Sequence, residues 1–255
     1  DDINIYENGE RDYTFTYNQH TLNLQALSFN IRNFSCDVNV RMDFYDFHDI
    51  LVGKSAVQQQ LDNIHMYSYV FTLNYDSEDR WFFTTRGARF KAGFGYHTDN
   101  FIGWKGHEGI SALDFLWRMS FPRRFTLQPM VYGRLLAGGD APLIMRNAVG
   151  GQFQSQYIEQ QLPFAGIGHI EFTDDALLAF QLRAQQRMGG NNYIMARLSL
   201  GQRGGRLRRL FERRPMFGCE AAYYYNSMFG PLGASLGYSG RTDRLYFYVN
   251  LGFHF

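Results

Sequence analysis

Residues 233–237 read Gly-Ala-Ser-Leu-Gly and match the Gly-x-Ser-x-Gly pattern of a serine nucleophile. That chemistry requires a strained turn between a strand and a helix, which exposes the serine hydroxyl. Ser235 instead lies in a segment of alternating polarity, between Ala234 and Leu236, and the sequence has no Asp-Gly pair to supply a catalytic aspartate. We therefore expect no catalysis at Ser235, and we interpret its small neighbours as residues that relieve crowding.

Six arginines crowd a second segment, residues 203–214. A planar guanidinium can bind two phosphate oxygens at once, so one interpretation is a site for the phosphates of lipopolysaccharide. The alternative is an ordinary solvated loop. The six are Arg203, Arg206, Arg208, Arg209, Arg213 and Arg214.

Metal and redox chemistry find little support in the sequence. Seven histidines are scattered without the spacing of a metal site. Two cysteines, Cys36 and Cys219, allow one disulfide at most, and the sequence leaves its formation open. We expect no cofactor and no metal.

The overall composition narrows the class of protein. The 255 residues include 25 Lys and Arg against 24 Asp and Glu, and this net charge of +1 leaves no cationic excess for binding nucleic acid. Aromatic residues make up 17% of the chain, and glycine (26) is common while proline (6) is rare, which favours strands. A hydrophobic content of 45% excludes a disordered chain.

A helical membrane protein is excluded as well. The longest run without a charged residue, 221–240, is 20 residues long but contains Asn226, Pro231 and several glycines and serines. A membrane-spanning helix needs a predominantly apolar stretch of that length. The mean hydropathy of −0.34 agrees with this exclusion.

Apolar and polar residues alternate with a period of two along ten segments, which is typical of strands with two different faces. In the last segment Leu245, Phe247 and Val249 share one face, while Tyr246 and Tyr248 share the other. No Asp, Glu, Lys or Arg falls on any of the ten apolar faces, although 19% of the residues are charged. The segments are 36–44, 67–75, 90–96, 113–119, 125–135, 178–184, 194–200, 217–225, 232–238 and 245–255.

A soluble sandwich would also alternate, with its polar face in water. The membrane reading is favoured because the segments are long enough to cross a bilayer at a tilt, and because Phe and Tyr lie near the ends of their apolar faces. We therefore predict an all-β fold, a transmembrane antiparallel β-barrel with its apolar face in lipid. An arginine at Leu198 should block assembly in the membrane, whereas Arg197→Leu should be tolerated.

The connections predict about eleven complete strands and the end of another in this chain. The strand at 13–29 is the least regular, with a phase slip near 18–21. Because bacterial single-chain barrels close with an even number of strands, we expect further strands before Asp1. Short turns near 31–33, 77–85, 122–123, 188–191 and 226–230 would be periplasmic. Connections near 46–65, 98–110, 138–175, 203–214 and 240–243 would be external.

The polar face carries charges of both signs, which would lie in the barrel lumen. We interpret them as ion pairs that hold a loop against the wall rather than as a selectivity ring. They are Asp37, Arg41, Asp43, Lys91, Asp114, Arg118, Arg134, Arg183, Arg187, Arg197 and Glu220.

Three local motifs resemble the BamA/TamA superfamily of sixteen-stranded outer-membrane barrels. Residues 227–232 with the terminal aromatic strand resemble its C-terminal end, residues 79–87 resemble a periplasmic turn, and residues 148–164 lie where a long loop folds inward before the twelfth strand. Two departures stand out: Thr84 replaces the usual proline of the turn, and the Val-Arg-Gly-Phe tetrad is missing. The motif residues are Asp79, Arg80, Gly87, Gly150, Gly151, Gly230 and Pro231.

The Val-Gly-Gly … Gln-Gln-Leu-Pro-Phe form of this loop is similar to the barrel of patatin-like phospholipases of the Bacteroidetes type. That resemblance implies that residues 1–255 are the C-terminal part of one sixteen-stranded barrel, of which 11–12 strands lie here, with residues 138–175 as the loop. It also implies a hydrolase domain before Asp1 that holds the Ser and Asp of the catalytic dyad, so that the barrel itself is non-catalytic and anchors or exports the enzyme.

Two other functions remain open. One is a BamA/TamA-type barrel for insertion or translocation of outer-membrane proteins, and the other is a passive porin. The expected location is the outer membrane of a Gram-negative bacterium, and the expected partners are outer-membrane lipid, lipopolysaccharide, the barrel assembly machinery and a second copy of the chain. The terminal strand resembles the signal that this machinery reads, on the face formed by Phe247, Val249, Leu251, Phe253 and Phe255.

Overall fold

The computed structural model describes residues 3–52, 63–99, 109–122, 125–155 and 158–252. Twelve strands form one antiparallel sheet in the order β1-β2-β3-β4-β5-β6-β7-β11-β12-β13-β14-β15, so each strand pairs with the next strand of this sheet along the chain. Their bounds are β1 Ile3–Glu7, β2 Glu10–Ile31, β3 Phe34–Val52, β4 Ile64–Asp76, β5 Gly87–Thr98, β6 Ile110–Pro122, β7 Thr126–Gly138, β11 Ala176–Gly189, β12 Asn192–Gly204, β13 Met216–Ser227, β14 Gly230–Ser239 and β15 Arg244–Leu251.

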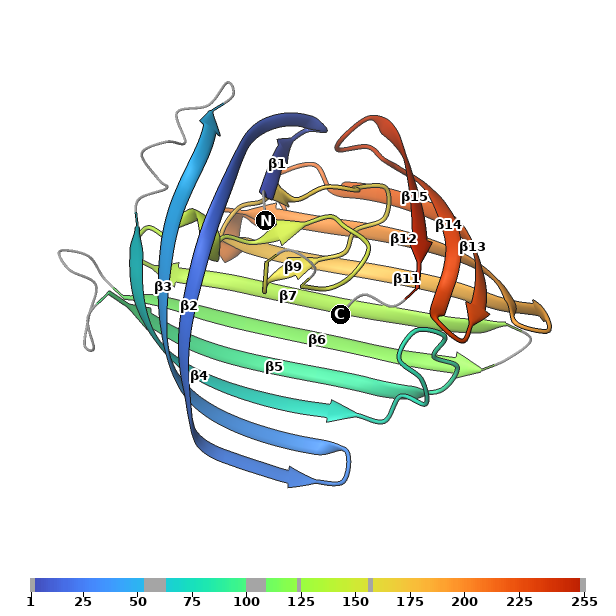
Figure 1. Cartoon of the computed structure of the whole chain (residues 1–255), viewed down its shortest axis with the longest axis horizontal. Helices are drawn as coiled ribbons and strands as arrows, with labels where there is room; N and C mark the ends of the chain where they lie inside the picture. The colour runs from blue at the N-terminus through green and yellow to red at the C-terminus, as the bar shows by residue number, and fades with distance from the viewer. Residues whose placement is uncertain (1–2, 53–62, 100–108, 123–124, 156–157, 253–255) are drawn as a thin grey trace.

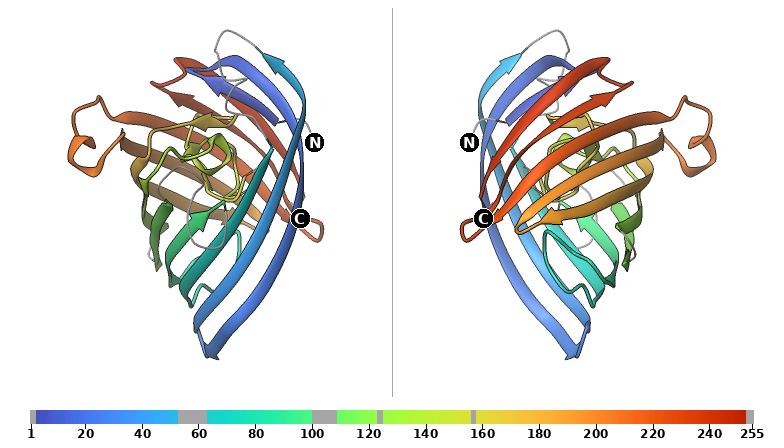
Figure 2. Two further views of the ribbon diagram at one scale, coloured as in Figure 1. Left: turned by 90° about the vertical axis from the view of Figure 1, so that its left-hand side faces the viewer. Right: turned by 90° about the vertical axis from the view of Figure 1, so that its right-hand side faces the viewer.

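The sheet curls around a smaller unit built from the connection between β7 and β11 (Figures 1 and 2). This connection contains the 3-10 turn η2 (Leu143–Met145) and three short strands, β8 (Ala148–Val149), β9 (Gln161–Leu162) and β10 (Glu171–Phe172). The short strands form a second sheet in the order β10-β8-β9. A further 3-10 turn, η3 (Leu207–Arg209), lies in the connection from β12 to β13.

The predicted fold class, an antiparallel all-β fold with 11–12 strands in this chain, is confirmed. Apolar and polar residues alternate along each strand, and the structure gives them different environments. The apolar side chains at every second position point away from the interior of the sheet. Phe71, Leu113 and Leu198 are 38%, 54% and 47% exposed in the middle of their strands. Such a continuous apolar surface on a folded chain marks a face that contacts something other than water. No helix of the described residues is long and apolar enough to cross a bilayer.

The irregular strand β2 differs from the expectation in detail. The ladder with β3 shifts between Thr14 and Thr16 and again between Gln25 and Leu27, and not at residues 18–21. The apparent slip near 18–21 has another cause: Tyr13 and Phe15 are apolar residues on the inward face, where they are buried. Below them the inward face becomes polar, so the pattern in the sequence changes although the backbone does not.

The buried core lies between the sheet and the connection that it encloses. One cluster joins Tyr13 and Phe15 of β2 to Ile144, Ile158 and other residues of the inner connection. A second cluster joins the walls β6, β7, β11 and β13 to the inner residues Val149, Leu162, Phe164 and Ile167. The inner connection is therefore a packed part of the fold, held by burial of apolar surface.

Candidate functional site

The inner connection, residues 139–175, is called the inner segment here. Its motif glycines allow the chain to fold tightly: Gly150 has a φ of +115°, and a Cβ atom there would collide with the carbonyl of His169. The Gly150 amide donates to Leu162 O (2.9 Å), and the Gln161 side chain donates to Gly150 O (2.7 Å). The Val-Gly-Gly motif (149–151) and the Gln-Gln-Leu-Pro-Phe motif (160–164) are thus one hydrogen-bonded unit.

The turn between β4 and β5, residues 77–86, enters the same interior from the opposite end of the sheet and is called the end turn here (Figure 1). Asp79 organises it by accepting hydrogen bonds from the Thr85 amide (2.8 Å), the Thr85 hydroxyl (2.6 Å) and the Arg86 amide (3.1 Å). Burial raises the pKa of Asp79, but these hydrogen bonds outweigh it and hold the pKa below its usual value. Thr84, which replaces the proline of the motif, is buried and its hydroxyl donates to Arg80 O (2.6 Å).

Three consecutive aromatic residues carry the end turn into the interior. Phe83 stacks on Tyr193 with ring centroids 4.0 Å apart, and Phe82 meets Tyr224 edge to face at 5.2 Å. Trp81 stacks on Phe153 of the inner segment at 6.3 Å. The two inserted elements therefore touch each other inside the curled sheet.

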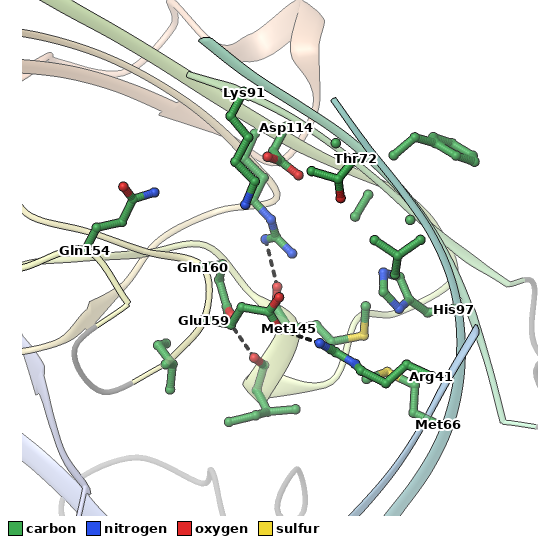
Figure 3. A pocket seen from close by; sticks show the side chains of 18 of the residues that line it. Arg41, Met66, Thr72, Lys91, His97, Asp114, Met145, Gln154, Glu159 and Gln160 are labelled. Carbon is green, nitrogen blue, oxygen red and sulfur yellow. Dashed lines mark hydrogen bonds and ion pairs between the residues drawn. The ribbon is translucent and has the colours of Figure 1, made fainter. Parts of the chain in front are cut away.

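Ion pairs connect the wall to the inserted elements, as the mixed charges predicted. Arg41 of β3 donates to Glu159 of the inner segment at 2.8 Å (Figure 3). Arg118 of β6 forms a two-pronged pair with Glu78 of the end turn, with Nε to Oε1 at 2.8 Å. For these groups the interpretation as paired charges is confirmed, and Glu78 and Glu159 are partners that the sequence analysis did not identify.

Arg197 of β12 is part of a three-membered network. Its guanidinium donates to Glu220 Oε1 at 2.7 Å and to Gln152 Oε1 at 2.8 Å, and the Gln152 amide donates to Glu220 Oε2 at 3.0 Å. The Glu220 side chain is 6% exposed. This pairing changes the expected result of Arg197→Leu, because the substitution leaves a buried carboxylate without its cation.

We now expect Arg197→Leu to destabilise the fold by about 3–5 kcal/mol, the cost of breaking a buried ion pair by removing one partner. Arg197→Leu combined with Glu220→Leu should recover much of the loss, since no buried charge is then left over. Urea unfolding of the protein in lipid vesicles would measure both. A double variant less stable than the single one would contradict the pairing argument.

The described residues enclose two polar cavities between the wall and the inserted elements. The smaller, of about 160 Å³, lies beside the Arg41–Glu159 pair and is lined by Lys91, Asp114 and His97 among others (Figure 3). The larger, of about 400 Å³, lies where the end turn and the inner segment meet, and its wall includes Arg183 and Arg197. Lys91 and Gln154 line both cavities.

The arginine-rich loop projects beyond the rim of the sheet, around η3 (Figure 2). Two of its six arginines have a local role, because Arg213 pairs with Asp174 at 2.9 Å and Arg203 approaches the same carboxylate at 3.9 Å. The other four are exposed: Arg206, Arg208, Arg209 and Arg214. Binding of lipopolysaccharide by this loop stays a prediction.

Replacing these four exposed arginines with glutamine should reduce the amount of lipopolysaccharide that co-purifies with the protein by several-fold, because each charge-assisted contact to phosphate is lost. The matched control is Arg203→Gln with Arg213→Gln, which removes the pair with Asp174 instead. Quantifying lipid A phosphate per mole of protein checks the effect. Unchanged lipopolysaccharide in the fourfold variant would support the solvated-loop interpretation.

The remaining sequence candidates occupy ordinary structural positions. Ser235 lies in the middle of β14, paired with Ala222 and Tyr248, and no helix follows it as far as residue 252, where the described residues end. Cys36 and Cys219 are free thiols. Pro231 accepts a hydrogen bond from the Gly252 amide (3.1 Å), and Gly230 has a φ of +103°. On the terminal strand Phe247, Val249 and Leu251 are 64%, 49% and 82% exposed. Phe253 and Phe255 lie outside the described residues.

Sequence reasoning missed the inward course of the end turn. It identified residues 79–87 as a motif but did not place Trp81, Phe82 and Phe83 in the interior. Three adjacent aromatic residues in a turn could have indicated it, because a solvated turn seldom carries so much apolar surface. Gln152 accepts a hydrogen bond from Arg197, and Phe153 stacks on Trp81. No comparable sequence feature indicated these two residues.

Comparison with known proteins gives a consistent result. A family model described as the OMP85 superfamily matches residues 12–255. A solved structure, the crystal structure of BamA from Haemophilus ducreyi lacking POTRA domains 1–3, is similar with a TM-score of 0.68 and 11% identity. The match covers 96% of this chain and 55% of that one, so this chain spans about half the length of its neighbour. At this identity the likeness shows the fold alone. No curated protein matches the chain.

Proposed function

The chain belongs to the OMP85 superfamily, and from this we propose that it is an outer-membrane β-barrel of a Gram-negative bacterium that anchors or exports a patatin-type lipid acyl hydrolase encoded before Asp1. The barrel does no chemistry itself. Residues 1–255 are the C-terminal part of a single barrel of sixteen strands, and its partners are outer-membrane lipid and the machinery that assembles barrels.

The observation that carries the membrane location is the outward face of the sheet. Large apolar side chains cover it from β3 to β15, including aromatic residues such as Phe94, Trp117 and Phe217. Water would oppose exposure of this surface, whereas lipid accepts it. Polar and charged residues of the same strands turn inward, where inserted elements pair with some of them, such as Arg41 and Arg118.

The patatin link is supported by the inner segment. Its Val-Gly-Gly and Gln-Gln-Leu-Pro-Phe motifs resemble that branch and form one hydrogen-bonded unit through Gly150, Gln161 and Leu162. The chain lacks the Val-Arg-Gly-Phe arginine, and its inner segment contacts the wall in other ways, among them the hydrogen bond from Arg197 to Gln152. A barrel whose lumen is filled in this way suits an anchor better than a passive porin.

A second candidate function is insertion or translocation of outer-membrane proteins, which the likeness to BamA favours. Sequencing the gene upstream of Asp1 separates the two. A Gly-x-Ser-x-Gly hydrolase domain there, with release of fatty acid from phospholipid by the full-length protein, supports the anchor. Tandem periplasmic repeats without a hydrolase would contradict it and support insertion. A signal peptide followed directly by strands would support a porin.

A further inference from the structure

The larger cavity carries an excess of positive charge. Five basic side chains and one acidic side chain line it: Arg89, Lys91, Arg118, Arg183, Arg197 and Glu220. Three of these cations have partners, because Arg89 lies 3.7 Å from Asp76, Arg118 binds Glu78, and Arg197 binds Glu220. The carboxylates of Asp76, Glu78 and Glu220 are therefore already paired with these three arginines.

Arg183 of β11 is different. Its Nε atom is shielded from solvent and has no hydrogen-bond partner among the described residues. In the ladder it lies directly across from Arg197 on one side and from Gln128 on the other. Like charges directly opposite each other repel. Arg183 thus keeps a buried donor that no group of the described residues accepts, next to a guanidinium of like charge.

A buried cation of this kind is costly unless an anion accompanies it. A guanidinium has a fixed fork of donors that matches the oxygens of a phosphate or carboxylate. The same cavity is also lined by the aromatic side chains of Trp81, Phe82 and Phe153 from the two inserted elements. The cavity of about 400 Å³ has room for a small organic anion, since pockets for small molecules begin near 300 Å³.

We propose that this cavity binds a small organic oxyanion, whose phosphate or carboxylate group lies on Arg183 and whose apolar part lies against Trp81 and Phe153. The ligand joins the wall to both inserted elements, because it contacts β11, the end turn and the inner segment at once. The site depends on the cavity and not on the domain before Asp1, so it stands or falls independently of the proposed function.

The test uses the purified full-length protein in detergent micelles at low ionic strength, with phenyl phosphate, benzoate and inorganic phosphate as probes in titration calorimetry. Phenyl phosphate or benzoate should bind more tightly than inorganic phosphate, and their comparison identifies the preferred oxyanion. Arg183→Gln should weaken binding of the preferred probe about tenfold or more, as expected for loss of a charge-assisted hydrogen bond. Trp81→Ala should weaken binding of the aromatic probe and leave the affinity for inorganic phosphate unchanged.

Arg187→Gln is the matched control. Arg187 lies on the same strand, four residues further along, and donates to the Gly190 carbonyl in an exposed turn, so its removal should leave affinity unchanged. Without ligand, Arg183→Gln should be as stable as the wild type or more stable, because no partner is lost. Absence of binding at millimolar concentration, equal losses in the two arginine variants, or a less stable Arg183→Gln with unchanged affinity would each overturn the proposal.

Discussion

An arginine at Phe71 is expected to prevent most of the protein from assembling in the membrane. Phe71 lies in the middle of β4, points outward and is 38% exposed, with Val38 and Phe94 as its partners in the ladder. In the middle of a bilayer an arginine on the lipid-facing side costs about 2–4 kcal/mol. That amounts to about a 30-fold or greater shift against the inserted state.

The same substitution one residue further along is the control. Thr72 points inward, lines the smaller cavity and lies across from Asp37 in the ladder. Thr72→Arg should therefore insert almost as well as the wild type, because the new charge meets a polar interior and an acidic neighbour. The fraction of protein in the membrane pellet that shows heat-modifiable migration measures both variants. Equal losses for Phe71→Arg and Thr72→Arg would overturn the assignment of faces.

Removing the inner segment is expected to open a path for ions through the interior of the barrel. Ala176, the first residue of β11, pairs with Leu135 of β7, so a short Gly-Ser linker can replace residues 143–172 without separating the two strands. The wild type should show little conductance in planar bilayers, because Ile144, Leu162 and Phe164 pack against the wall. The variant should show stepwise currents at least several-fold larger.

A linker in place of residues 206–213 is the matched control, since that loop lies at the rim and leaves the interior filled. It should conduct like the wild type. Folding of both variants is checked by heat-modifiable migration. This check is needed because removal of residues 143–172 exposes the inward apolar residues of the wall that they cover. Large open channels in the wild type would contradict a closed lumen and favour the porin alternative.

Much of the fold could be predicted from the sequence, because a strand with one face in an apolar environment and one in a polar environment alternates apolar and polar residues with a period of two. Segments such as 113–119 and 194–200 carry apolar residues at every second position, and the structure turns those positions outward. The expected phase slip at 18–21 was wrong, because the polarity of the inward face changes there while the pairing of β2 with β3 stays regular. There the inward face passes from apolar residues under the inner segment to polar ones below it.

The candidate site was predicted in part. The inward charges were recognised, and their role as ion pairs was expected, but two of their partners, Glu78 and Glu159, lie on elements far away in the chain. Glu159 is 118 residues from Arg41, and Glu78 is 40 residues from Arg118. A periodic pattern contains no information on which loop folds back to meet a given strand.

The sequence by itself determined the strands, the face of each that is apolar, and the motifs that mark the family, because these depend on neighbours within a few residues. Only the tertiary structure decided what fills the interior. The end turn and the inner segment meet there because both carry aromatic and polar groups that complement an inward wall assembled from many strands. The same assembly leaves Arg183 facing a cavity without a partner among the described residues. The Nε atom of Arg183 lacks a partner among them because of how residues distant in the sequence pack around it, and no single stretch of the sequence contains that information.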